Sequence, residues 1–213
     1  TWYADASNEA LKRSAAGTYY LWYRIQGDSG YDDVAPQAFT SNATIAINKS
    51  NITVTATAAE LNEAVDWDGT AKQAIKTGIT ATGQGDLTIY YAVTTSNSAP
   101  DAGVADVWYT SISDANLKVT AANTYYAYYK VVSNDVNVNA YTPTAITGTF
   151  AINKIAASIS QEPTAKSLTY TGVAQALVNA GTAVGGTMEY SLDNTSWSEN
   201  IPTFTNAATE KTV

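Results

Sequence analysis

Apolar and polar side chains alternate most clearly in two aromatic segments, residues 18–25 and 124–131. A period of two that holds over eight residues predicts a β-strand with one face turned to a core. We expect the face that ends on Ile25 or Val131 to point inward, and the face that ends on Arg24 or Lys130 to point outward. The inward face comprises Tyr19, Leu21, Tyr23 and Ile25 in the first segment and Tyr125, Ala127, Tyr129 and Val131 in the second.

Shorter runs of β-branched and aromatic residues, separated by turns rich in Gly, Asp and Asn, predict further strands. These runs are residues 43–48, 51–57, 87–93, 107–112, 145–153, 157–160 and 187–192. Residues 58–65 are compatible with a short helical turn. Many short strands without helical crossovers predict an all-β fold, an antiparallel sandwich or barrel.

An internal repeat organises the chain. Residues 46–49 (AINK) recur as residues 151–154, and the aromatic segment that begins at Gly17 recurs 106 residues later at Asn123. A third copy follows Lys154, in which Trp197 takes the place of Trp2 and Trp108. A period of this length matches one compact domain.

The repeat predicts three parts. Residues 1–49, the N-terminal segment, form the C-terminal part of one unit. Residues 50–154, the middle segment, form a complete unit with a loop insertion around residues 96–100. Residues 155–213, the C-terminal segment, form the N-terminal part of a further unit.

Composition narrows the function classes. The chain has no histidine and no cysteine, which excludes disulfides, thiolate chemistry and histidine relays. A formal net charge of −8 is a poor match for nucleic acid, and no apolar run is long enough to insert into a membrane. Few charged residues with much Thr, Ser, Asn and Ala are typical of a secreted β-protein. We therefore expect an extracellular or cell-surface location.

Several motifs together resemble a known class of repeat. In immunoglobulin-type domains a corner tyrosine stands two residues before the core cysteine position. Tyr19 stands two residues before Leu21, and Tyr125 stands two residues before Ala127. The stretches 17–19 (GTY), 27–36 (GDSGYDDVAP), 168–178 (LTYTGVAQALV), 186–193 (GTMEYSLD), 197–198 (WS) and 201–203 (IPT) resemble the tandem Ig-like repeats, MBG or YDG type, of large bacterial cell-surface proteins and adhesins. The resemblance implies tandem Ig-like antiparallel β-sandwich domains in an extracellular setting, and it brings no catalytic residues.

Candidate catalytic and metal sites are sparse. The carboxylate pairs Asp32/Asp33 and Asp66/Asp68 lie in turn-like sequence without a surrounding motif, and no lysine has a serine three residues before it. We expect no enzymatic activity and no cofactor. Asp28, Asp32 and Asp33 could offer oxygens to calcium, but the stretch does not match a calcium-binding loop and reads as a polar turn.

Four aromatic residues form the most specific candidate interaction surface: Tyr20, Trp22, Tyr126 and Tyr128. If they point outward, they could stack on sugar rings or bind a partner. The alternative, which we favour, is cross-strand pairing or cover by a neighbouring domain, because the same row recurs at both places.

These observations predict a non-catalytic structural segment of an extracellular bacterial filament, fibre or adhesin stalk. The alternative is a module that binds a glycan or a host surface through the Tyr/Trp face. The expected partners are neighbouring repeats or copies of the chain itself, arranged head to tail and with possible strand donation between them. Residues 197–213 repeat much of what residues 2–21 supply, which favours continuation in a longer chain over donation.

Overall fold

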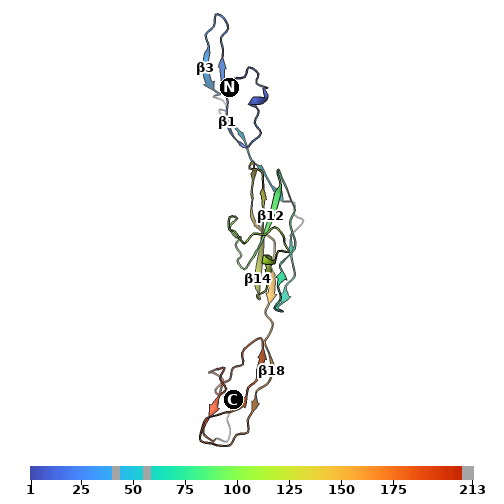
Figure 1. Cartoon of the computed structure of the whole chain (residues 1–213), viewed down its shortest axis with the longest axis vertical. Coiled ribbons are helices and arrows are strands. Elements are labelled where there is room, and N and C mark those ends of the chain that lie inside the picture. The colour runs from blue at the N-terminus through green and yellow to red at the C-terminus, as the bar shows by residue number, and fades with distance from the viewer. Residues whose placement is uncertain (40–43, 55–58, 208–213) are drawn as a thin grey trace. The chain divides into compact units, whose positions relative to one another are not determined.

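The computed structural model describes residues 1–39, 44–54 and 59–207 and is nearly all β (Figure 1). Strand pairs are antiparallel except β15 with β5 and β17 with β8, so the predicted all-β, sandwich-type fold class is confirmed. Two 3-10 helices, η1 (Glu9–Leu11) and η2 (Ala115–Leu117), are the helices of the described part, and neither could cross a membrane.

Contacts divide the chain into two compact units, Thr1–Asn153 and Lys154–Val213. This division falls one residue before the boundary predicted after Lys154. The three-part organisation stays a prediction, and the two units are described separately below.

A five-stranded sheet lies at the centre of the first unit. Its order is β12 (Leu87–Thr94), β14 (Asn123–Ser133), β17 (Phe150–Asn153) and β8 (Val65–Asp66), and β16 (Tyr141–Ala145) also pairs with β14. β14 pairs with β12 through eight consecutive residue pairs. Two-residue and three-residue strands accompany this sheet: β5 (Ser50–Asn51), β6 (Thr53–Val54), β7 (Glu60–Leu61), β9 (Lys72–Gln73), β10 (Ile75–Thr77), β11 (Ala81–Thr82), β13 (Lys118–Val119) and β15 (Val138–Asn139).

The core of the first unit lies between these strands and one face of β14. The most deeply buried large side chains are Ile75, Leu117, Val131 and Phe150. The inward face predicted for residues 124–131 is confirmed, since all four of its residues, Tyr125, Ala127, Tyr129 and Val131, are buried. Strict alternation therefore predicted the core-facing side of this strand correctly.

The N-terminal segment contains four strands: β1 (Gly17–Tyr20), β2 (Trp22–Ile25), β3 (Val34–Ala38) and β4 (Thr44–Ile47). The pairing of β1 with β4 has the same register as the pairing of β14 with β17. The pairing of β2 with β3 likewise has the register of β14 with β16, and in both cases the register shifts before the last residue pair. The phenol of Tyr19 donates to the Ala15 carbonyl at 2.7 Å, as the phenol of Tyr125 does to the Ala121 carbonyl. The two segments thus share local structure.

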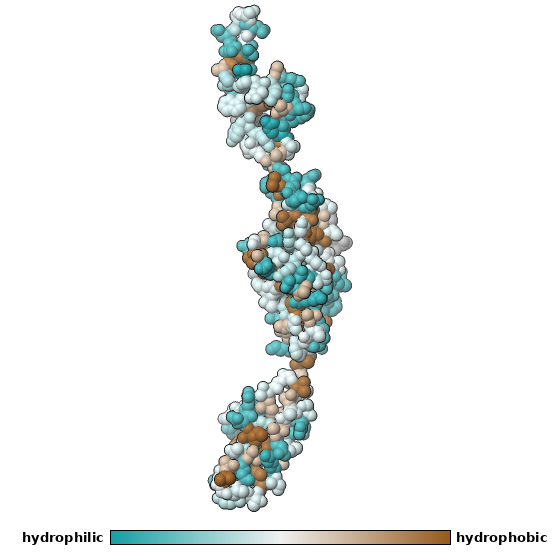
Figure 2. All heavy atoms as spheres, viewed as in Figure 1, coloured by the Kyte–Doolittle hydropathy of each residue, from teal (hydrophilic) through white to brown (hydrophobic). Residues whose placement is uncertain are grey.

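The core face of the N-terminal segment is nevertheless exposed. Leu21, Tyr23 and Ile25 are 37%, 42% and 58% exposed, so the prediction that they pack inward is wrong here. In the middle segment the same face is covered by side chains from residues 50–92, such as Ile52 and Ile75. The described part of the N-terminal segment holds no counterpart of that layer, and its hydrophobic side chains reach the surface (Figure 2).

The second unit repeats pairings of the middle segment. Its strands are β18 (Ser158–Gln161), β19 (Thr164–Ala165), β20 (Gln175–Ala176), β21 (Val178–Asn179), β22 (Thr182–Val184) and β23 (Thr203–Phe204). The pairs β18–β22, β19–β21 and β20–β23 match β6–β11, β7–β10 and β9–β13 in order along the chain. The Tyr190 phenol oxygen accepts from the Gly181 N–H, as the Tyr91 oxygen accepts from the Ile79 N–H.

Four sequence-based predictions of elements need correction. The helical turn over residues 58–65 is wrong, because Glu60 and Leu61 form β7 against β10; residue 58 lies outside the described residues. The strands predicted at 107–112 and 187–192 are each reduced to one bridge, Tyr91 with Tyr109 and Tyr190 with Ser198. The strand predicted at 145–153 is interrupted by a turn before β17. Residue 43 of the strand predicted at 43–48, and residues 55–57 of the strand predicted at 51–57, lie outside the described residues.

Tyr129 makes stability sensitive to alkaline pH. Its ring stacks on Tyr141 at a centroid distance of 5.9 Å, and burial, followed by a hydrogen bond with Tyr141, raises the pKa of Tyr129 to about 12. Between the unfolded value of 10.0 and this folded value, the unfolded state releases more protons than the folded state, so stability falls as pH rises. We expect a loss of about 2 kcal/mol between pH 10 and 12 from this group. Urea unfolding at several pH values measures it, and Tyr129→Phe should flatten the decline; an unchanged slope would contradict the assignment.

Candidate interaction surface

The outward face of β14 is covered instead of exposed. Tyr128 is only 3% exposed and Tyr126 is half-buried, so the Tyr128 ring is not offered to a ligand at the surface of the middle segment. Tyr128 packs in a small cluster with Ala92 and Trp108. Burial raises the pKa of the Tyr128 phenol, and a coulombic effect of Tyr126 adds to it.

The cover is the loop that connects β12 to Tyr109, where the sequence predicts an insertion. Seventeen residues separate Tyr91 from its bridge partner Tyr109, whereas seven separate Tyr190 from Ser198. Two carbonyl groups of the loop accept hydrogen bonds from β14: Ser96 from the Tyr128 phenol at 3.2 Å, and Ala102 from the Lys130 ammonium. A third bond lies within the loop, where the Trp108 indole donates to the Asp101 carbonyl at 3.0 Å. The longer loop therefore closes over the aromatic row of the middle segment.

Lys130 lies between two aromatic rings under this loop. Its ammonium is 4.7 Å from the Trp108 ring centroid and 5.1 Å from the Tyr90 ring centroid. Burial lowers the pKa of Lys130, while the nearby Asp101 carboxylate opposes that shift. The ring faces and the carboxylate compensate the cation for lost water, so Lys130 has a structural role in this position.

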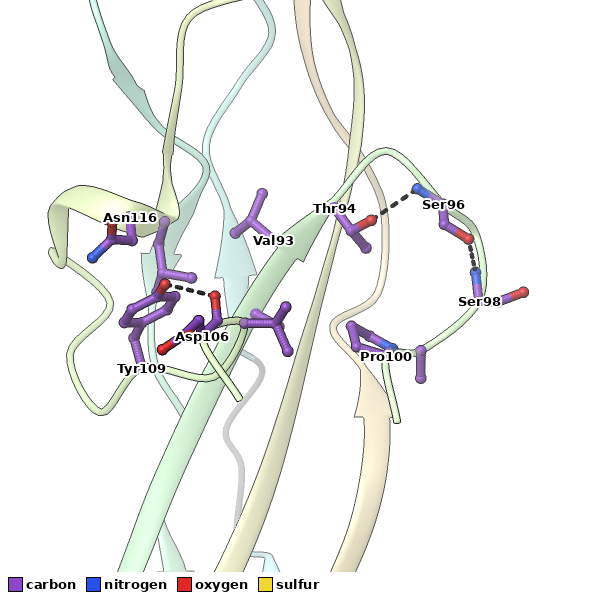
Figure 3. Close-up of a pocket in the computed structure, with 12 residues that line it drawn as sticks. Val93, Thr94, Ser96, Ser98, Pro100, Asp106, Tyr109 and Asn116 are labelled. Atoms are coloured by element: carbon purple, nitrogen blue, oxygen red, sulfur yellow. Dashed lines mark hydrogen bonds between the residues drawn. The ribbon is translucent and has the colours of Figure 1, made fainter. Parts of the chain in front are cut away.

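A pocket of about 440 Å³ opens beside the same loop (Figure 3). Ser96, Ser98 and Pro100 line it from the loop, Val93 from β12, and Tyr109 and Asp106 from the opposite wall. The Tyr109 phenol donates to the Asp106 carbonyl at 2.7 Å. Asp106 is the one charged residue among the lining residues, so the pocket offers hydroxyl, amide and apolar contacts but no acid–base pair.

The equivalent aromatic residues of the N-terminal segment are exposed. Tyr20 is 68% and Trp22 is 56% exposed, at the end of β1 and the start of β2. Arg24 places its guanidinium carbon 4.8 Å from the centroid of Trp2. The sequence did not lead us to count Tyr31 among the exposed aromatic residues, although its side chain is 81% exposed. Its position after Gly30 in a turn was the signal for exposure. Of the four predicted residues, Tyr20 and Trp22 thus remain candidates for contact with a ligand.

Asp28, Asp32 and Asp33 lie in the turn between β2 and β3. The Asp28 carbonyl accepts from the Tyr31 N–H at 2.9 Å, and the Asp33 carboxylate accepts from the Gly27 N–H at 2.8 Å. Both bonds hold the turn closed. Within residues 1–39, 44–54 and 59–207, no three or more Asp, Glu, His or Cys side chains gather where they could hold a metal ion.

Comparison of the chain with protein-family models, with curated proteins and with solved structures yields no significant match. The function is therefore argued from the residues and their geometry.

Proposed function

We propose that the chain is a structural, non-catalytic segment of an extracellular bacterial filament, fibre or adhesin stalk, built from tandem Ig-like β-sandwich units. The observation that carries the proposal is the recurrence of strand register. The pairs of β1 with β4 and of β2 with β3 lie 105–107 residues before matching pairs around β14. A chain made of tandem copies of one sandwich domain is suited to bridging a distance and to holding the parts at its ends in position.

The corner tyrosines support the Ig-like part of the proposal. The Tyr19 and Tyr125 phenols each donate to the carbonyl four residues earlier in the chain, just before the strand that contains the tyrosine. A tyrosine in this position that bonds back to the backbone is typical of immunoglobulin-type sandwiches.

Two carboxylates, those of Asp68 and Asp193, behave as turn-forming groups and not as general acids. A general acid needs a raised pKa, yet the Lys72 ammonium holds the pKa of Asp68 well below its usual range. The backbone N–H of Ser196 does the same for Asp193. Both groups accept hydrogen bonds from neighbours two to four residues away, as turn-forming residues do.

Immunogold electron microscopy with antibodies against this chain tests the proposal on the native material. We expect gold particles along threads on the outside of intact cells of the source organism. Labelling that requires permeabilised cells would contradict the surface location, and labelled isolated globular particles would contradict the filament.

A second candidate function is binding of a glycan or host surface by Tyr20 and Trp22, favoured by their exposure. If it holds, Trp22→Ala should weaken binding to a polysaccharide about tenfold, because a stacked ring is lost. Calorimetry against a panel of cell-wall and host polysaccharides measures this. Trp67→Ala, which removes a 42% exposed ring elsewhere, is the control. Absence of binding to the whole panel, or equal effects of the two variants, would refute the candidate.

A further inference from the structure

The pocket beside the loop after β12 is formed by a feature that the second unit does not repeat. The connection that closes the Tyr91–Tyr109 bridge is ten residues longer than the one that closes the Tyr190–Ser198 bridge, so the bridge itself does not need the extra length. The longer connection supplies one wall of the pocket. Binding residues concentrate on such loops, because a rigid scaffold holds them at the surface.

The size and composition of the pocket suit a small ligand. Its volume of about 440 Å³ lies within the range of small-molecule sites, roughly 300–1,000 Å³. All of its lining residues lie between Ala92 and Leu117, so one segment of the chain forms the whole site. Apolar side chains, among them Val93 and Val107, alternate around it with hydroxyl, amide and carboxylate groups. Such a lining can hold a ligand that has both apolar and hydrogen-bonding surface.

Asp106 carries a carboxylate that has no partner within the described residues. The Tyr109 phenol bonds its main-chain carbonyl, and neither a hydrogen bond nor an ion pair there engages its side chain. Its φ is +60°, in the left-handed region that glycine adopts freely and other residues adopt at a cost. The fold thus keeps a carboxylate where glycine would cause less strain, which is a compromise found at binding sites.

Hydroxyl and amide groups of the lining keep unused hydrogen-bonding capacity. The Thr94 hydroxyl oxygen accepts from the Ser96 N–H at 3.1 Å, and the Ser96 hydroxyl oxygen accepts from the Ser98 N–H at 3.2 Å (Figure 3). Both hydroxyls act as acceptors in these bonds, so each retains its O–H for a ligand. The Asn116 amide nitrogen donates to the Asp114 carboxylate at 3.0 Å, which leaves its amide oxygen as an acceptor.

The charge of the lining narrows the class of ligand. Lys and Arg are absent from the described residues that line the pocket, so a phosphate or a carboxylate ligand would find no cation. An amine could pair with Asp106 but would leave the hydroxyl donors of Thr94 and Ser96 unused, because an ammonium accepts no hydrogen bond. A neutral polyol can both donate and accept, and its C–H surface can pack on apolar and aromatic side chains.

We propose that this pocket binds a short neutral saccharide. Hydroxyl groups of the saccharide donate to the Asp106 carboxylate and accept from Thr94 and Ser96, while its C–H surface packs on Val93 and the Tyr109 ring. The inference goes beyond the proposed function and does not rest on it, because a filament segment with this site and one without it would label alike in electron microscopy.

Nuclear magnetic resonance titration of the ¹⁵N-labelled 213-residue chain tests the proposal. The probes are neutral hexoses, N-acetylhexosamines and their disaccharides, with methylammonium as the amine. We expect saturable amide shifts at residues 93–98 and 106–109 for at least one saccharide, with a dissociation constant of about 1 mM, as for other ligands of this size. No shift with any saccharide, shifts confined to Tyr20 and Trp22, or shifts at the pocket with methylammonium alone would each overturn the proposal.

Two variants with matched controls test the assigned contacts. Asp106→Asn keeps the shape of the side chain, and asparagine also tolerates a positive φ, so the chain should fold and bind about three- to tenfold more weakly. Asp101→Asn, which makes the same change of charge in the same loop outside the lining, should bind normally. Thr94→Val should weaken binding to a similar extent, and Thr88→Val, on the same strand but outside the lining, should not. Equal effects of a variant and its control would overturn the assignment.

Discussion

Phe150→Ala is expected to destabilise the central sheet by about 3–5 kcal/mol, the cost of an aromatic-to-alanine change in a closed core. Phe150 is 1% exposed and lies opposite Tyr125 in the pairing of β17 with β14, with ring centroids 6.4 Å apart. Its cluster includes Ala74 and Ile152, both nearly inaccessible. The truncated side chain would leave a cavity that these fixed neighbours cannot fill.

Ile45→Ala is the matched control, because Ile45 lies opposite Tyr19 as Phe150 lies opposite Tyr125. Ile45 is 50% exposed, so its truncation should cost less than about 1 kcal/mol. Hydrogen exchange at the β12 and β14 amides measures the effect of Phe150→Ala, and exchange at the β1 and β4 amides measures that of Ile45→Ala. Local readouts avoid assuming that the whole chain unfolds in one step. Similar effects of the two variants would show that the face beside Ile45 is covered in solution.

The contrast between these two residues shows how far the sequence predicts the fold. Alternation over residues 124–131 correctly predicted the buried face of β14, since a period of two is a local property of the chain. The same alternation over residues 18–25 predicted strands but not burial. Burial depends on a second layer supplied by other residues, and local pattern carries no information about whether that layer is present.

The candidate surface shows the same limit. Tyr20 and Tyr126 occupy equivalent positions, as do Trp22 and Tyr128, yet only the N-terminal pair is exposed. The difference comes from the loop after β12, whose carbonyls bond Tyr128 and Lys130 from 32 and 28 residues away in sequence. The loop's extra length could be read from the sequence, but the face on which it folds could not.

Gly85→Ala is expected to destabilise the middle segment by about 2–4 kcal/mol. Gly85 has a φ of +75°, in the left-handed region that costs other residues roughly 1–2 kcal/mol. A Cβ there would also lie 2.6 Å from the Ser133 hydroxyl and 2.7 Å from the Asn134 amide oxygen. These atoms bond the Gln84 carbonyl and the Asp86 N–H, so moving them away breaks hydrogen bonds that join the start of β12 to the end of β14.

Gly185→Ala separates the two causes. Gly185 has nearly the same φ, +79°, but the nearest atoms to a Cβ are those of Ala157 at 3.7 and 4.0 Å, an ordinary contact. Gly185→Ala should therefore cost only the strain of the left-handed backbone conformation, about 1–2 kcal/mol. Hydrogen exchange at the Tyr91 and Tyr190 amides, each bonded to its bridge partner, measures both variants locally. A larger loss of stability for Gly85→Ala than for Gly185→Ala would assign the difference to the contact between Gly85 and residues 133–134. Equal losses would mean that the end of β14 moves away from the new Cβ without losing stability.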